Sequence, residues 1–334
     1  MKPSKIFLPE QITQLYEYAE SVTFYNERYR QGYMEEWSIE KKQQIFEIVH
    51  NLQLPDTGEA IDFGCGNGIL TDIIREALPS GWKIYGTDIS PIAIKKAQNH
   101  YPRCNFFVKN DTYDVTKKFD LLFTHHVLEH VYNLDLTIKE IDTYVKDDAL
   151  MLHILPCGNP GSYEYFISVL HKNGINPNLE NRFFFEDEGH VRRLTSDQLC
   201  YSLSQIGFVL TDDYYANQYY GAINWITQTK LRILKNVTDS TSAIDEHAKK
   251  ALKKQRFRLL LIWILRYRHK SIERLLHKKN KNFQNYLMLI PGIFLFACTK
   301  PMNYYIEKKS NEEWIQRKGD KNGSEMYLFF KRDK

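Results

Sequence analysis

The chain has 334 residues, of which 43% are hydrophobic and 26% are charged, a balance typical of a folded globular protein. Its five cysteines form no C-x-x-C pair, which argues against a disulfide framework and for a reducing compartment. The amino-terminal segment lacks the apolar stretch of a secretion signal, and no uninterrupted apolar run reaches the roughly 18 residues of a membrane-spanning helix. We therefore expect a cytoplasmic location.

The formal net charge of +4 is unevenly distributed along the chain. Residues 249–281 contain thirteen Lys or Arg and a single acid, Glu273, so this segment carries +12 and the rest of the chain carries −8. A chain that is mildly basic overall is therefore an acidic body with one strongly basic patch.

From Ala60 onward, predicted strands and helices alternate. A short strand and a glycine-rich loop occupy 60–68, and further strands are expected over 83–90, 105–111, 119–126, 149–156 and 208–215. Helices are expected over 69–78, 91–101, 134–145 and 195–207. This rhythm predicts an α/β fold with a mostly parallel sheet and helices on both faces.

The ends of this pattern divide the chain into four predicted segments. Residues 1–54 look helical and precede the first strand, and residues 55–220 form the core. Residues 221–324 interrupt the rhythm with a helical segment that is both basic and apolar, and residues 325–334 return as one more strand. The simplest organisation is one α/β domain with a helical insertion before its last strand.

The glycine-rich loop DFGCGNG begins at Asp62 and ends at Gly68. It follows a strand and leads into a helix, which is where an open α/β sheet binds ligands. A dinucleotide fingerprint would have Gly or Ala at position 69, where this chain has Ile69. Asp88 ends the second strand and is placed to accept both hydroxyls of a ribose, and a further acid, Asp111, ends the third.

In these motifs the chain resembles the class I S-adenosylmethionine-dependent methyltransferases, over residues 55–215 and the final strand. The resemblance implies a Rossmann-like sheet whose last strand is antiparallel. It also implies a cofactor site, with Gly64 and Gly66 along the methionine moiety, Asp62 helping to position it, Asp88 on the ribose and Ile89 against the adenine. The remaining implied cofactor residues are Phe63, Asn110, Asp111 (at the adenine amino group) and His125. A nicotinamide-dependent oxidoreductase is the alternative from a different class.

The segment HHVLEHV, residues 125–131, follows the fourth strand. The resemblance implies that it faces the reactive end of the cofactor. If a helix begins here, His126, Glu129 and His130 share one face, because they stand at i, i+3 and i+4. Such a set suits a divalent metal, but His125 or His126 could equally act as a general base, or the segment could serve structure or substrate binding alone. Each chemical role favours methylation of a hydroxyl, which is a poor nucleophile until it is deprotonated.

This segment also resembles the E-x-x-E-H motif of two metal-dependent branches of the family. These are the O-methyltransferases of ubiquinone biosynthesis and the small-RNA 2′-O-methyltransferases, and both add a histidine from further along the chain. The resemblance implies metal ligands at His126, Glu129, His130 and His190. His126 stands where those branches have Glu, which favours zinc, manganese or iron over magnesium because imidazole suits the later transition metals.

The basic segment leaves three interpretations open: a solvated helix with a core-facing side, a helix on a membrane surface, or a phosphate-binding surface for RNA. Its aliphatic bulk favours residues 249–297 lying on an anionic membrane over contact with nucleic acid. Some methyltransferases of cell-surface glycans resemble this layout. We therefore expect O-methylation of a glycan or lipid-linked acceptor by a protein on the inner face of the membrane. A small-RNA ribose or a quinone-type phenol is the alternative acceptor.

Overall fold

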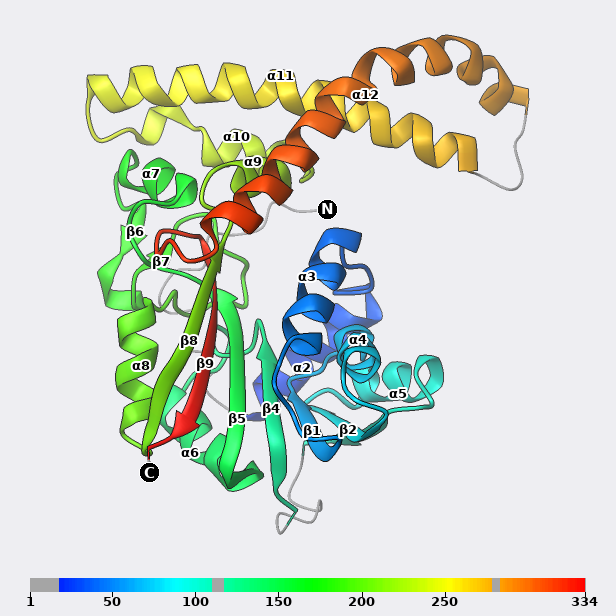
Figure 1. Cartoon of the computed structure of the whole chain (residues 1–334). Coiled ribbons are helices and arrows are strands. Elements are labelled where there is room, and N and C mark those ends of the chain that lie inside the picture. The colour runs from blue at the N-terminus through cyan, green and yellow to red at the C-terminus, as the bar shows by residue number, and fades with distance from the viewer. Residues whose placement is uncertain (1–17, 110–116, 278–282, 334) are drawn as a thin grey trace. The chain divides into compact units, whose positions relative to one another are not determined.

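The computed structural model of the chain describes residues 18–109, 117–277 and 283–333 (Figure 1). Contacts divide the chain into two compact units. The first comprises residues 1–156, 188–213 and 326–334, and the second comprises residues 157–187 and 214–325. These units are defined by spatial contacts, and each contains separate stretches of the chain. They therefore do not test the predicted bounds of the core, 55–220, and of the insertion, 221–324, which stay a prediction.

A seven-stranded sheet carries the fold, in the order β3-β2-β1-β4-β5-β9-β8. Its strands, in chain order, are β1 (Thr57–Phe63), β2 (Gly81–Asp88), β3 (Asn105–Val108), β4 (Phe119–His125), β5 (Val145–Pro156), β8 (Phe208–Ala216) and β9 (Glu325–Arg332). The first five pair in parallel, and the last strands are antiparallel. The predicted fold class is therefore confirmed, including the return of the chain's end as a strand of the same sheet.

Helices cover both faces of this sheet (Figure 1). One face carries α3 (Ile39–His50), α4 (Ile69–Ala77) and α5 (Pro91–His100), and the other carries α6 (Leu134–Tyr144) and α8 (Ser196–Ser204). α2 (Tyr18–Arg30) packs beside α5. The interior of the sheet is buried, with Ile61 of β1 and Leu122 of β4 completely shielded from solvent. This arrangement fixes the carboxyl ends of neighbouring strands along one edge.

The second unit is mainly helical. Its elements are α7 (Tyr163–Val169), β6 (Ile175–Asn176), η2 (Pro177–Leu179), β7 (Arg182–Phe183), α9 (Tyr220–Ile226), α10 (Leu231–Val237), η3 (Ser240–Ser242), α11 (Glu246–His277) and α12 (Phe283–Arg317). α11 and α12 pack against each other, and α12 also packs on α9. An apolar core around Ile223, Leu252 and Leu259 holds these helices together. None of the described helices is long and apolar enough to cross a membrane.

Candidate active site

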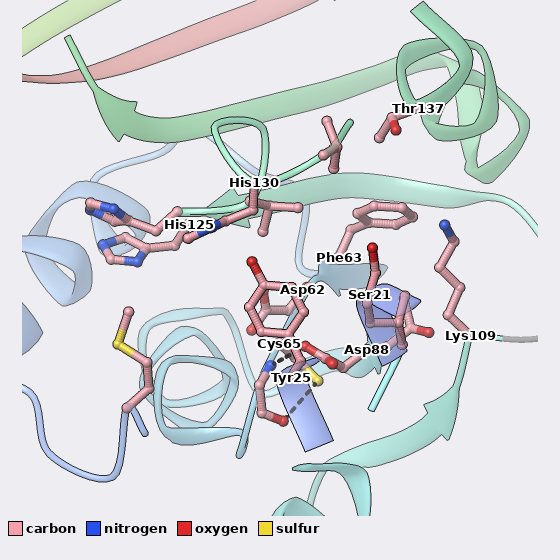
Figure 2. A pocket seen from close by; sticks show the side chains of 18 of the residues that line it. Ser21, Tyr25, Asp62, Phe63, Cys65, Asp88, Lys109, His125, His130 and Thr137 are labelled. Carbon is pink, nitrogen blue, oxygen red and sulfur yellow. Dashed lines mark hydrogen bonds between the residues drawn. The ribbon is translucent and has the colours of Figure 1, made fainter. Parts of the chain in front are cut away.

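A cavity of about 360 Å³ lies in the first unit, at the carboxyl ends of β1, β2 and β4 (Figure 2). Its volume falls within the usual range for small-molecule sites, and open α/β sheets bind ligands at this edge. Nine residues predicted from the sequence line it: Asp62, Phe63, Gly64, Gly66, Asp88, Ile89, His125, His126 and His130. Two further predicted cofactor residues, Asn110 and Asp111, lie outside the described residues.

The glycine loop after β1 has a backbone that only glycine adopts easily. Gly64 has a φ of 80°, and a Cβ built on it would lie 2.3 Å from Cγ2 of Val127. Gly66 has a φ of 55°, and its Cβ would lie 2.8 Å from the hydroxyl of Tyr29. Positive φ costs little for glycine, and a missing side chain lets the backbone approach a ligand closely. The loop is therefore fixed by its own sequence.

Two buried acids stand at the strand ends on either side of this loop. Asp62 accepts a hydrogen bond of 2.6 Å from the hydroxyl of Thr71, yet burial raises its pKa to about 7. Asp88 accepts backbone N–H groups from Gly66 at 3.0 Å and Ser90 at 2.8 Å. Burial raises the pKa of Asp88 to about 6, although both hydrogen bonds and the charge of Lys109 lower it. Both carboxyl groups are thus held in place and are sensitive to charge brought into the cavity.

Helix α2 and the segment after it contribute a wall of aromatic side chains that the sequence prediction left unassigned. Tyr25, Tyr29, Tyr33 and Trp37 all line the cavity. A hydrogen bond connects this segment to the glycine loop: the side chain of Asn67 donates to the carbonyl of Met34 at 2.8 Å. Tyr25 and Tyr29 are four residues apart and therefore lie on one side of α2, whereas Tyr33 and Trp37 follow the end of that helix.

Residues 126–130 form a bend and a turn, so the expectation of a helix starting here is wrong. His126 has a φ of 53°, a left-handed backbone that is uncommon for a residue other than glycine. The next helix, α6, begins at Leu134, where the side chain of Asn133 caps it by accepting from the N–H of Leu136. His126, Glu129 and His130 therefore do not share a helix face.

A second segment, residues 190–192, holds this turn in its shape. The buried guanidinium of Arg192 donates to the carbonyls of Leu128, Val131 and Tyr132, with distances of 3.3 Å to Leu128 and 2.9 Å to Tyr132. These carbonyls are thereby satisfied without a helix. The N–H of Val191 donates to the carbonyl of Glu129 at 2.8 Å, which places the neighbouring His190 beside the turn.

Three of the four predicted metal ligands come together in this way. His126, Glu129 and His190 each offer a ligand atom, and these atoms lie within 4.8 Å of one another. Nδ1 of His126 is 2.8 Å from Oε1 of Glu129, and Nε2 of His190 is 4.0 Å from the same oxygen. The fourth, His130, packs edge-on against His190, with ring centroids 4.6 Å apart.

The carboxylate of Glu129 is the centre of this cluster. It is completely buried, and neither oxygen receives a hydrogen bond of good geometry from the described residues. Burial raises its pKa, but His126, His130 and His190 together outweigh burial, so that the net pKa lies below the usual value. A buried carboxylate is stabilised by a positive charge, which His126 at 2.8 Å supplies when its imidazole is protonated.

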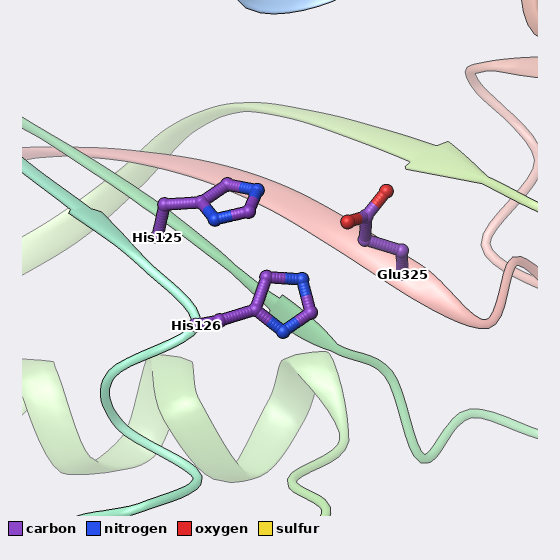
Figure 3. A group of neighbouring side chains, drawn as sticks. All are labelled: His125, His126 and Glu325. Carbon is purple, nitrogen blue, oxygen red and sulfur yellow. The ribbon is translucent and has the colours of Figure 1, made fainter. Parts of the chain in front are cut away.

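His125 ends β4 and lies beside His126 at the cavity wall (Figure 3). Their ring centroids are 4.4 Å apart, and Trp37 packs edge-on against His125 at 4.7 Å. His125 is buried and His126 is partly exposed. Both predicted proton acceptors therefore lie at the cavity, with an aromatic ring beside them.

Comparison with known proteins gives one family match and several partial relatives. A family model described as a methyltransferase domain matches residues 30–212, more than half of the chain. The juvenile hormone acid O-methyltransferase of Bombyx mori is 25% identical over 44% of this chain and 55% of its own length. The ubiquinone biosynthesis O-methyltransferase of Mesorhizobium japonicum is 28% identical over 27% of this chain and 38% of its own length.

Solved structures resemble the fold at low sequence identity. The 1,6-didemethyltoxoflavin-N1-methyltransferase of Burkholderia thailandensis, solved with S-adenosylhomocysteine, is 14% identical. The match covers 65% of this chain and 87% of that chain, with a TM-score of 0.46. The chain spans about half or less of the two curated relatives named above.

Proposed function

The chain belongs to the S-adenosylmethionine-dependent methyltransferase family, and we propose that it transfers the methyl group to a hydroxyl oxygen of a glycan or lipid-linked acceptor. This membership sets aside the nicotinamide-dependent oxidoreductase. We propose oxygen as the methyl acceptor because of the cluster of His126, Glu129 and His190 next to the cofactor cavity. An acceptor hydroxyl must lose its proton during transfer, and this cluster offers groups that can assist that loss.

The residues of the glycine loop and of β2 have defined tasks in this proposal. Gly64 and Gly66 leave room for the methionine moiety, with Asp62 beside it. Asp88 accepts the ribose hydroxyls, because a carboxylate has about four acceptor positions and two backbone N–H groups occupy only part of them. Ile89, which also lines the cavity, packs on the adenine.

His126, Glu129 and His190 fit a divalent metal by their chemistry and spacing. Two ligand atoms bound to one ion at roughly 2.0–2.1 Å lie at most about 4.2 Å apart, so small side-chain rotations bring these three into range. Two imidazoles and one carboxylate favour zinc, manganese or iron over magnesium. When bound, such an ion lowers the pKa of an acceptor hydroxyl.

The metal-free alternative uses a histidine as the general base. His125 lies at the cavity beside Trp37, and His126 faces Glu129, which would stabilise a proton on that imidazole. In this version Glu129 orients His126 and holds its charge, as a carboxylate does for a catalytic histidine. Both versions methylate an oxygen, in keeping with the O-methyltransferase names of the two curated relatives.

Metal content and chelation separate the two versions. We expect purified protein to carry one zinc, manganese or iron ion per chain by elemental analysis, and a chelator to abolish methyl transfer. Binding of S-adenosylhomocysteine, measured by calorimetry, should change little, because its contacts lie at β1 and β2. Glu129→Gln should lose the ion at nearly constant side-chain volume. The control, Glu76→Gln, changes an acid of α4 that is far more exposed.

The outcomes discriminate between the versions. Protein without metal that stays active in chelator, with activity lost in His125→Ala or in His126→Ala, would overturn the metal version and leave the general base. No binding of S-adenosylhomocysteine at all would contradict the whole assignment. A panel of acceptors, comprising glycans, lipid-linked sugars, quinone-type phenols and small RNA, tests the acceptor class. Transfer to RNA ribose or to a phenol in place of a glycan would replace the proposed substrate.

A further inference from the structure

Helix α11 presents two opposite faces, and both of them are apolar. Its inward face contributes Ala248, Leu252, Leu259 and Ile262 to the second unit's apolar core. Its outward face exposes Phe257 by 75%, Leu261 by 50% and Ile264 by 45%. Positions 257, 261 and 264 fall on one stripe of a helix, so these exposed side chains form a continuous strip.

The same outward face is strongly basic toward its amino-terminal end. Lys250, Lys253 and Lys254 are exposed and lie within about 60° of Phe257 around the helix axis. No acidic residue occurs between Glu246 and Glu273. We name these six residues, Lys250, Lys253, Lys254, Phe257, Leu261 and Ile264, the α11 outer face.

Two of the segment's arginines take no part in this surface. Arg266 is buried and donates to the carbonyl of Asn224 at 3.0 Å, with Glu307 at 3.4 Å. Arg258 donates to the hydroxyl of Tyr219. Among the described side chains of the outward face, the positive charge is therefore carried by the lysines at one end of the apolar strip.

We propose that the α11 outer face binds the surface of an anionic phospholipid bilayer, with the apolar strip in the headgroup region and the lysines on the lipid phosphates. Bulky apolar residues beside lysines are the pattern of helices that lie in a membrane interface. Helix α12, which packs on α11, also exposes apolar side chains, with Ile293 at 55% and Phe294 at 74%.

This proposal does not depend on which hydroxyl is methylated. It concerns a surface of the second unit, whereas the cofactor cavity lies in the first. Failure of either assignment therefore leaves the other standing.

The test is co-sedimentation of the full chain with phosphatidylcholine vesicles, prepared with and without phosphatidylglycerol. Binding should require phosphatidylglycerol and weaken at high salt. A triple variant, Lys250→Glu, Lys253→Glu and Lys254→Glu, should lower vesicle affinity about 100-fold at low salt. A second triple variant, Phe257→Ser, Leu261→Ser and Ile264→Ser, should lower it by at least about tenfold, because three apolar insertions are lost.

Two matched variants of the first unit serve as controls. Lys83→Glu, Lys95→Glu and Lys139→Glu reverse the same charge at exposed positions, and Tyr201→Ser with Val209→Ser removes exposed apolar bulk. Both should bind vesicles as the parent does. Circular dichroism should show the same melting temperature for all variants, since every changed side chain is exposed.

Three results would overturn the proposal. One is an absence of sedimentation with anionic vesicles at low salt. Another is vesicle binding that survives loss of the apolar strip, together with binding of the parent protein to RNA. This result would make the face a phosphate-binding surface. The third is a concentration-dependent dimer that the serine variant abolishes, without vesicle binding, which would make the face an interface between copies of this chain.

Discussion

The turn after β1 and the turn after β4 lie at the same edge of the sheet, but different parts of the chain hold them. The first, residues 63–68, has its shape from its own glycines and from the carbonyl of Thr87, which accepts from Gly64 at 2.8 Å and from Cys65 at 2.9 Å. The second, residues 126–132, is held by Arg192 and Val191 from a segment about sixty positions further along the chain.

This difference separates cofactor binding from proton chemistry. The first turn carries the backbone approach and the acids assigned to the cofactor, and its shape depends on its own glycines and on the end of β2. The second turn carries the histidines and becomes a cluster only when His190 is brought to it. The two turns meet at one point, where Gly64 leaves room for the side chain of Val127.

The largest effect should come from filling that point of contact. Gly64→Ala places a Cβ 2.3 Å from Cγ2 of Val127 and forces a φ of 80° on a residue with a side chain. We expect affinity for S-adenosylhomocysteine to fall by about 100-fold, because both turns must shift. Calorimetry measures the affinity, and thermal melting shows whether the fold survives.

A double variant distinguishes the collision from the backbone strain. Val127→Ala in the Gly64→Ala background removes the contacts at 2.3 and 3.1 Å and leaves a 3.3 Å contact and the unfavourable φ, so it should restore part of the affinity. The control, Gly319→Ala, has no atom within 4 Å of the added Cβ and should bind the cofactor normally. If the double variant is no better than Gly64→Ala alone, the two turns are not coupled through this contact.

An intermediate effect is expected at the support of the second turn. Arg192→Met removes the donors to three carbonyls, one in a buried and two in part-buried hydrogen bonds, and should cost roughly 2–4 kcal/mol of unfolding free energy. Methyl transfer should fall far more than cofactor affinity, because His190 loses its place beside Glu129. Denaturant unfolding measures the stability, and separate assays measure affinity and turnover.

The control for this variant is Arg30→Met. Its guanidinium makes an exposed ion pair with Glu27, with side chains 61% and 57% exposed, so the change should stay within about 0.5 kcal/mol. Equal losses of cofactor affinity and turnover in Arg192→Met would show that the second turn also supports the cofactor. Cofactor binding and proton chemistry would then not be separated between the two turns.

The sequence predicted the first turn better than the second for the same physical reason. A glycine loop between a strand and a helix has local signals, so Gly64, Gly66, Asp62 and Asp88 could be placed at the cavity in advance. The shape of the second turn depends on a buried arginine distant in sequence, and local spacing therefore suggested a helix that is not there. His190 was nonetheless found, because a family motif supplied the long-range link.

Two other features lay beyond local sequence patterns. Tyr25, Tyr29 and Trp37 line the cavity, and periodicity alone does not tell that α2 and the segment after it lie beside the strand ends. Helix α11 is apolar on both sides, so its sequence shows no clear division between core and surface. Only the burial of Leu259 against the exposure of Phe257 reveals which side is which.

The smallest effect should come from Lys109, which lines the cavity and pairs with Glu140 at 2.7 Å. Its positive charge lowers the pKa of Asp88, which burial raises to about 6. Lys109→Met removes that charge, so the pKa of Asp88 should move upward. Because the ribose hydroxyls need the carboxylate as acceptor, cofactor affinity should decrease as pH falls through the pKa of Asp88.

We therefore expect the midpoint of the affinity profile to shift upward in Lys109→Met, with a loss of about threefold near pH 6 and little loss near pH 8. Glu140→Gln is the matched control, because it removes the acid that pairs with Lys109 and leaves the lysine charge in place. Its midpoint should stay constant or move downward. A loss in Lys109→Met that is the same at every pH would mean that the lysine contacts the cofactor directly, and that the charge of Asp88 does not govern the first turn. A loss of affinity confined to low pH would show that the site assigned to the ribose can be adjusted without disturbing the histidine turn.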